Sequence, residues 1–100
     1  MQETKPEARL TPKSIEDLES IFQYTADRWG LDKADNYTAK LKNGFQTLAE
    51  NPYSGYDCSI LRPDLRCAHI GHHIAFYRPA SYGVAIIRVL HERMYARSHL

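Results

Sequence analysis

The sequence contains few cysteines and no long apolar segment. Only two of its 100 residues are cysteine, Cys58 and Cys67, too few for the dense disulfide framework of a small secreted domain. The longest apolar run covers residues 84–87, far below the roughly 20 residues that a membrane-spanning helix requires. Residues 1–9 also lack the apolar core of a signal peptide. We therefore expect a cytoplasmic protein with reduced thiols and no membrane association.

Lysine is absent after Lys42, and the charge is unevenly distributed. Residues 1–60 carry seven Lys and Arg against ten Asp and Glu, whereas residues 61–100 carry six arginines against two acidic residues. Arginine suits carboxylate and phosphate recognition better than lysine does. Two interpretations stay open: the arginines extend over a sheet edge, or the second half meets an anionic surface, either nucleic acid or an acidic protein segment.

Motifs for common cofactors and metals are missing. The sequence contains no P-loop, GxSxG or dinucleotide-binding fingerprint. His69, His72 and His73 accompany the two cysteines, but no CxxC or HxxxH spacing supports a tetrahedral site. We expect neither a cofactor nor a metal.

Periodicity predicts an α+β fold in a single domain over residues 1–100, with residues 1–6 flexible. Residues 7–11 alternate as a strand. A helix is expected to begin at Thr11-Pro12 and end near Trp29-Gly30. Its buried stripe, at three-and-four spacing, is expected to consist of Ile15, Leu18, Ile21, Phe22, Thr25 and Trp29. A second helix is expected from Asp32 to Asn51-Pro52, and the short link of two or three residues makes the pair an antiparallel hairpin.

The second half reads as a loop followed by strands. Residues 51–64 are rich in turn formers, and three antiparallel strands are expected at residues 65–70, 73–78 and 84–90. Residues 92–100 are expected to form a final helical turn. The predicted architecture is a two-layer sandwich: an N-terminal strand, the helix hairpin and three antiparallel strands.

The last strand is too apolar for a sheet with one exposed face. Strict alternation places Ile87 and Val89 on one face and Val84, Ile86 and Leu90 on the other. Two helices cover only one face, so the other would expose aliphatic side chains, each contributing about 1.5–3 kcal/mol when buried. Either the C-terminal segment folds across this face, or a partner chain covers it with a helix or an added strand.

Several segments, in order along the chain, resemble the ParE branch of the ParE/RelE toxin family. They include LTPKSIEDLESIFQYTADRWG at 10–30, LKNGFQTLAENPYSGY at 41–56, IAFYRP at 74–79 and IIRVLHERMYARSHL at 86–100. Between them lie Arg62-Pro63, Leu65-Arg66 and Gly71-His72-His73. The similarity extends over nearly the whole chain, from about Leu10 to Leu100.

The resemblance implies a RelE-like fold and a toxin that inhibits DNA gyrase, not an enzyme. It also implies a ParD-type antitoxin that wraps the toxin and alone contacts operator DNA. We expect the antitoxin to bind at Arg66, Tyr77, Ile86, Arg88 and Leu90. For the target we expect contacts from Arg88 and His91 and from the basic tail, through Arg93, Tyr95 and Arg97.

Two alternative functions stay open. RelE-type relatives cleave mRNA on the ribosome, and such chemistry needs a base, an acid and a cation near the phosphate. The candidate residues for that reaction are Arg66, Arg78, Arg88, His91 and Tyr95. The other alternative is a chain without toxicity that acts only as a corepressor with its antitoxin.

Overall fold

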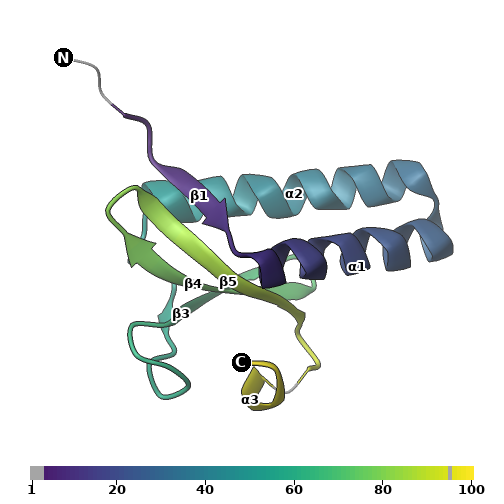
Figure 1. Ribbon diagram of the computed structural model, residues 1–100. Helices are drawn as coiled ribbons and strands as arrows, with labels where there is room; N and C mark the ends of the chain where they lie inside the picture. Colours follow the sequence, from purple (N-terminus) through teal and green to yellow (C-terminus); the bar gives the residue numbers. More distant parts are fainter. Residues whose placement is uncertain (1–3, 95) are drawn as a thin grey trace.

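The computed structural model describes residues 4–94 and 96–100 (Figure 1). The ends of its two long helices are set by neighbouring capping residues. Helix α1 spans Pro12–Trp29, and the Oγ1 of its cap Thr11 accepts the Ser14 N–H at 3.2 Å. Gly30, at a φ of 92°, is the single residue before α2, Leu31–Glu50. The antiparallel hairpin is confirmed, but its link is shorter than predicted because α2 begins before Asp32.

The strands form one five-stranded sheet in the order β1-β5-β4-β3-β2. The first strand, β1 (Glu7–Leu10), pairs parallel to β5, and the other neighbours are antiparallel. The three expected strands are present with slightly different ends, as β3 (Arg66–Ile70), β4 (His73–Ala80) and β5 (Gly83–His91). The extra strand β2 (Tyr56–Asp57) was not predicted, since two residues among turn formers show no alternation. The final turn is α3 (Ala96–His99).

Helices α1 and α2 cover one face of the sheet, as predicted for a two-layer α+β sandwich (Figure 1). The core between the layers joins apolar residues of both helices to the facing residues of β4 and β5. Its buried members are Leu18, Leu41, Phe45, Leu48, Ala49, Ala75, Tyr77, Val84, Ile86 and Val89.

A β-bulge at Ile87 changes which side chains of β5 face the helices. Tyr77 lies opposite Ile86 and Phe76 lies opposite Arg88, so Ile87 is an extra residue in β5. Beyond it, Val89 packs in the core with Ile86, whereas Ile87 packs on the opposite face. The predicted strict alternation, which placed Ile87 with Val89 and Leu90 with Ile86, is therefore wrong.

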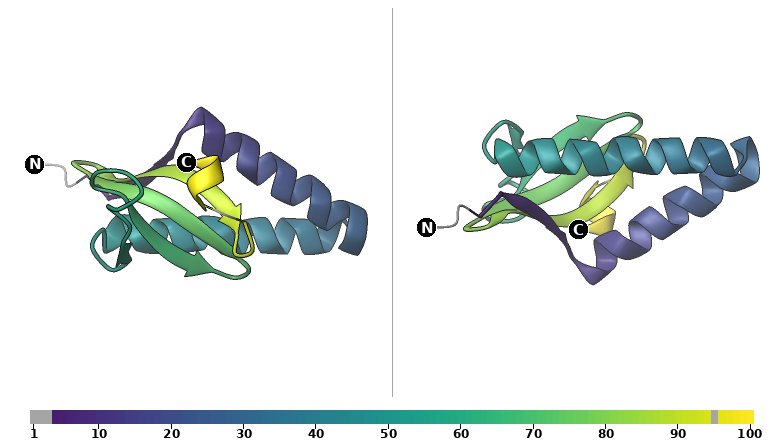
Figure 2. Two further views of the ribbon diagram at one scale, coloured as in Figure 1. Left: turned by 90° about the horizontal axis from the view of Figure 1, so that it is seen from below. Right: turned by 90° about the horizontal axis from the view of Figure 1, so that it is seen from above.

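The face opposite α1 and α2 is covered by the chain itself. A second cluster is formed there by the buried side chains of Leu65, Phe76 and Leu90. Leu61 from the loop after β2, together with Ala96 and Leu100 from the tail, packs against it. Figure 2 shows α3 lying across the sheet on this side. Of the two alternatives, cover by the C-terminal segment is confirmed, and the expected exposed apolar face is wrong.

Some expectations concern other parts of the chain. The predicted flexibility of residues 1–6 falls partly on residues 1–3, which lie outside the described residues. Over the described ranges, no helix combines the length and the apolar character needed to cross a membrane. Cys58 and Cys67 are both described and are free thiols.

Candidate functional site

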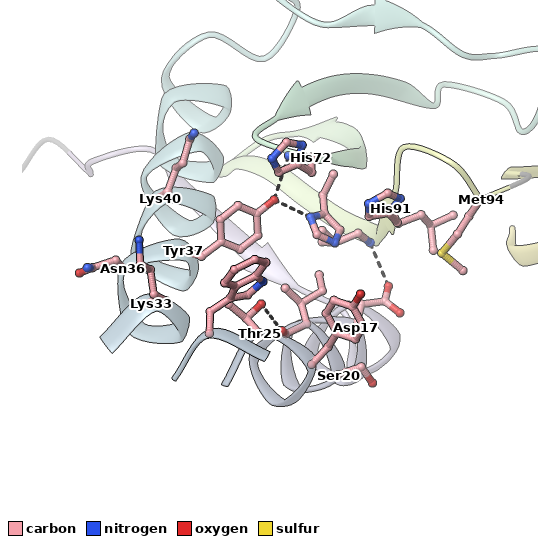
Figure 3. A pocket seen from close by; sticks show the side chains of 16 residues that line it. Asp17, Ser20, Thr25, Lys33, Asn36, Tyr37, Lys40, His72, His91 and Met94 are labelled. Atoms are coloured by element: carbon pink, nitrogen blue, oxygen red, sulfur yellow. Dashed lines mark hydrogen bonds between the residues drawn. The ribbon is translucent and has the colours of Figure 1, made fainter. Parts of the chain in front are cut away.

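A groove of about 1100 Å³ lies between the two helices and the end of the sheet (Figure 3). Both helices extend beyond the strands near Gly30 (Figure 1), so their facing sides are not fully covered there. The lining residues come from α1, α2, the β3–β4 turn, β4, β5 and the segment after β5. They are Asp17, Ser20, Ile21, Tyr24, Thr25, Trp29, Lys33, Asn36, Tyr37, Lys40, His72, His73, Val89, Leu90, His91 and Met94.

Large apolar side chains are exposed along this groove. Trp29 is 68% exposed and Tyr24 is 61% exposed, and Met94 lies on the opposite wall. Trp29 had been predicted to lie in the buried stripe of α1, but that end of the helix extends past the sheet. A gathering of exposed aromatic and apolar groups in a concave site indicates a binding surface for another molecule.

A hydrogen-bonded cluster forms the inner wall of the groove. The Tyr37 hydroxyl lies 2.5 Å from Nδ1 of His73 and accepts the backbone N–H of His72 at 3.0 Å (Figure 3). The His73 ring also packs edge-on against His91, with 5.3 Å between ring centroids. Burial, followed by the neighbouring His91 and His72, lowers the pKa of His73 to about 4. At neutral pH His73 is therefore uncharged, and the Tyr37 hydroxyl and Nδ1 of His73 share one hydrogen bond.

The rim of the groove is basic. Lys33 and Lys40 stand on the exposed side of α2, one turn before and one turn after Tyr37. Glu92 lies near the other rim, where its carboxylate contacts His69 at 2.9 Å and His72 at 3.7 Å. The hydrogen bond from His69 is the main cause that lowers the pKa of Glu92. The two lysines have no such acidic partner among the described contacts, so they give this rim its charge.

A match to known proteins now identifies the family. A family model described as "ParE toxin of type II toxin-antitoxin system, parDE" matches residues 8–95. The chain belongs to this ParE toxin family. The resemblance predicted from the sequence is thereby confirmed, and the protein is the toxin component of a type II toxin–antitoxin module.

Relatives of this toxin are similar over most of their length. It is 40% identical over 86 residues to Toxin ParE1 of Mycobacterium tuberculosis, covering 85% of this chain and 88% of the relative. It is 39% identical over 92 residues to Toxin ParE1 of Caulobacter vibrioides, covering 92% and 95%. A solved structure of a chromosomal ParDE system from P. aeruginosa superposes with a TM-score of 0.74 at 18% identity, covering 89% and 98%, which supports the fold.

The toxin does not bring its predicted nuclease residues together. Arg66 lies on the helix side, where its Nη2 donates to the carbonyl oxygens of Tyr53 and Gly55. Arg78 donates to the Pro63 carbonyl in the loop on the opposite side. Arg88 and His91 lie on opposite faces of β5. Tyr95 lies outside the described residues. These four described side chains do not share a site at which one phosphate can bind.

Most residues predicted to contact the antitoxin are occupied within the toxin. Tyr77 and Ile86 are completely buried and Leu90 is nearly so. Arg88 is held in an ion pair with Asp17 and also donates to the His99 carbonyl oxygen. Arg66 is held by the two carbonyls named above. Their side chains therefore present little free surface to a partner.

Among the residues predicted for target binding, three remain on the surface. Arg93 and Arg97 are exposed on the tail, and His91 lines the groove. Tyr95, also predicted for this role, lies outside the described residues. Sequence reasoning missed Lys33, Lys40 and Tyr37 as groove residues. The sequence offered one indication of the groove. Trp29 stands directly before Gly30, so a large aromatic side chain lies at the end of a helix.

The described residues contain no cluster of three or more His, Cys, Asp or Glu side chains that could hold a metal ion. Glu92 instead forms a hydrogen bond with His69 and an electrostatic contact with His72.

Proposed function

We propose that this toxin inhibits DNA gyrase in the cytoplasm and that a ParD-type antitoxin neutralises it by occupying the groove between α1 and α2. The family match over residues 8–95 supports the gyrase proposal. The dispersal of Arg66, Arg78, Arg88 and His91 favours inhibition by binding over RNA cleavage. Operator DNA would be contacted only by the antitoxin.

The groove is the surface best suited to the antitoxin. The opposite face of the sheet is already covered by Leu61, Ala96 and Leu100. In contrast, Trp29 and Tyr24 remain largely exposed in the groove. Burying an aromatic side chain of this size contributes strongly to an interface. Removing these two rings from water would therefore contribute to the affinity of a partner that fits the groove.

The charge on the groove indicates the chemistry of the occupant. The floor is apolar, through Ile21 and Val89, whereas Lys33 and Lys40 make one rim basic. An amphipathic helix with an apolar face and acidic flanking residues is complementary to both features. We therefore expect the antitoxin segment in the groove to be helical and acidic.

The tail is the proposed surface for gyrase. Arg93 and Arg97 are exposed, and Arg97 lies on the short helix α3. Because gyrase handles DNA, a basic surface suits a region of the enzyme that is acidic or carries DNA. The proposed surface also includes Tyr95 and His91, which were predicted from the sequence to contact the target.

The decisive experiment measures supercoiling of relaxed plasmid by purified gyrase with increasing amounts of the toxin. We expect loss of supercoiling or accumulation of cleaved plasmid, and recovery when the antitoxin is added first. Cleavage of mRNA on purified ribosomes, with gyrase unaffected, would instead establish the nuclease alternative. Absence of growth arrest when the toxin is expressed without its antitoxin would leave only the corepressor role.

The tail proposal has its own test. The double variant Arg93→Glu and Arg97→Glu changes two exposed side chains, so we expect an unchanged circular dichroism spectrum and melting temperature. We expect it to inhibit gyrase about tenfold less strongly while still binding the antitoxin. Lys13→Glu with Lys5→Glu is the matched control on an unrelated surface. Full inhibition by the tail variant would contradict a target-binding role for these arginines.

A further inference from the structure

Cys58 and Cys67 are diagonal neighbours on one face of the sheet. Cys67 of β3 lies opposite Tyr56 of β2. The Cys58 N–H donates to the Leu65 carbonyl oxygen at 2.8 Å, which continues the β2–β3 pairing past its last regular pair. Because Cys58 follows Tyr56 by two residues, both cysteine side chains point to the same face.

The two thiols also share the same surroundings. Both side chains pack against the second apolar cluster, beside Leu65 and Phe76, and each is partly exposed to solvent. Burial, followed by the neighbouring Cys58 side chain, raises the pKa of Cys67 to about 12. Cys67 therefore stays protonated at neutral pH, and the first reaction with an electrophile falls to Cys58.

We propose that Cys58 and Cys67 form an oxidation site at which a two-electron oxidant of the peroxide class converts the two thiols into an intramolecular disulfide. Neither cysteine lines the groove or belongs to the residues proposed to contact gyrase, so the inference does not depend on the proposed target. A thiol reductant of the cytoplasm would restore the free pair.

The chemistry balances in two steps. The Cys58 sulfur attacks one oxygen of hydrogen peroxide, the O–O bond breaks, and Cys58 becomes a sulfenic acid as one water leaves. The Cys67 sulfur then attacks the Cys58 sulfur, the S–S bond forms and the S–O bond breaks. The departing hydroxide takes the Cys67 proton and leaves as a second water. Two thiols lose two electrons in total, and the peroxide accepts them.

The disulfide would fasten the loop that covers the far face of the sheet. Residues 59–66 lie between the two cysteines and include Leu61 and Leu65, which pack on Phe76. A covalent link across this short loop restricts the unfolded chain and holds the loop against the cluster. We therefore expect the oxidised toxin to melt at a higher temperature than the reduced toxin.

The test treats the full-length chain with hydrogen peroxide, then denatures it in the presence of N-ethylmaleimide and measures its intact mass. We expect the oxidised chain to have lost two hydrogens, to carry no maleimide and to regain two reactive thiols after dithiothreitol. In Cys67→Ser, which keeps the reactive thiol, we expect a sulfenic acid that dimedone traps. In Cys58→Ser we expect the remaining thiol to stay largely unmodified.

Several results would overturn the proposal. Two maleimide adducts on the wild-type chain after peroxide would show that the thiols do not react. A sulfinic acid on wild-type Cys58, or a disulfide-linked dimer as the main product, would show that Cys67 does not reach Cys58 first. Because masses are read on denatured chains, a partly unfolded serine variant does not obscure these outcomes, and wild type alone decides them.

Discussion

Asp17 of α1 and Arg88 of β5 are joined by two hydrogen bonds, Nε to Oδ2 at 2.8 Å and Nη2 to Oδ1 at 2.9 Å. The same carboxylate accepts the backbone N–H of Val89 at 2.9 Å. Strand β1 pairs with β5 only as far as Ile86, so beyond the bulge the edge of β5 has no strand neighbour on that side. Asp17 accepts one N–H group of this unpaired edge, in place of a neighbouring strand, and thereby attaches α1 to the sheet.

Replacing Asp17 by alanine is expected to lower the free energy of unfolding by about 3 kcal/mol. The change leaves the largely buried Arg88 guanidinium without its partner and removes the acceptor of the Val89 N–H. Urea denaturation measures the loss. Glu16→Ala, at an exposed neighbouring position, is the control and should change stability by less than about 0.5 kcal/mol. An equal effect of the two substitutions would show that the Asp17 contacts contribute little.

The parts of the fold with local chemical signals were predictable. Thr11-Pro12 and Gly30 set the ends of α1 because capping depends on a few adjacent residues. The bulge at Ile87 has no such signal, since neither a glycine nor a turn residue marks it. For the cover of the far face, the sequence left two alternatives open, the C-terminal segment or a partner chain, because the choice depends on where Leu61 and Leu100 lie in space.

The groove was harder to predict than the fold. It arises because the hairpin extends beyond the strands, and that overhang depends on tertiary packing. Apolar spacing alone placed Ile15 and Trp29 in the buried stripe of α1, but they are 43% and 68% exposed. A periodic pattern shows which residues share a helix face, whereas it does not show how far the opposing layer reaches.

Stability should fall as His73 becomes protonated. Its folded-state pKa of about 4 lies below the ordinary value of 6.5, so the folded state favours neutral His73. This contribution is complete above pH 6.5 and is lost as the pH falls from 6.5 towards 4. After allowance for partial exposure, we expect a loss of about 1–2 kcal/mol in the free energy of unfolding over this range.

The comparison that isolates this effect is urea denaturation of wild type and His73→Asn between pH 7 and pH 4. Asparagine retains an acceptor near the position of Nδ1 for Tyr37 but does not titrate. We expect a shallower pH dependence in this variant, while His99→Asn, at an exposed position, should retain the wild-type slope. Parallel slopes for wild type and His73→Asn would assign the acid sensitivity to other groups.

Substitutions in the groove should weaken antitoxin binding in two different ways. Trp29→Ala removes a largely exposed ring, and we expect it to weaken binding by about 2 kcal/mol, roughly 30-fold in Kd, mainly through faster dissociation. Lys33→Glu with Lys40→Glu reverses the charge of the rim and should slow association, with a smaller effect at high salt. Surface plasmon resonance at two salt concentrations measures both.

The matched control for the aromatic substitution is Tyr56→Ala, which removes an exposed ring from β2 at a position outside the groove. We expect it to bind the antitoxin as wild type does. If Tyr56→Ala weakens binding as much as Trp29→Ala does, the antitoxin contacts extend to the other end of the molecule and the groove is not the main site.

The Tyr77 hydroxyl is expected to stabilise the chain that follows α2. It donates to the Pro52 carbonyl oxygen at 2.9 Å and accepts the Gly55 N–H at 3.0 Å. Tyr77→Phe leaves both backbone groups without this partner, and we expect a loss of about 1–3 kcal/mol in the free energy of unfolding. Tyr53→Phe, at an exposed position, should have almost no effect. Thermal denaturation followed by circular dichroism distinguishes the two.

The extra residue in β5 allows this strand to pair with β1 along its first part and to contact α1 and the tail along its second part. Up to Ile86, β5 pairs with β1. After Ile87 the alternation of side chains between the two faces is shifted by one residue, so that Val89 faces the helices while Arg88 contacts both Asp17 and the tail. If side chains alternated regularly through Ile87, Arg88 would share the face of Ile86 and point toward the apolar core, and Val89 would turn away from the helices. The register shift at Ile87 therefore determines whether the helix layer and the C-terminal cover can coexist.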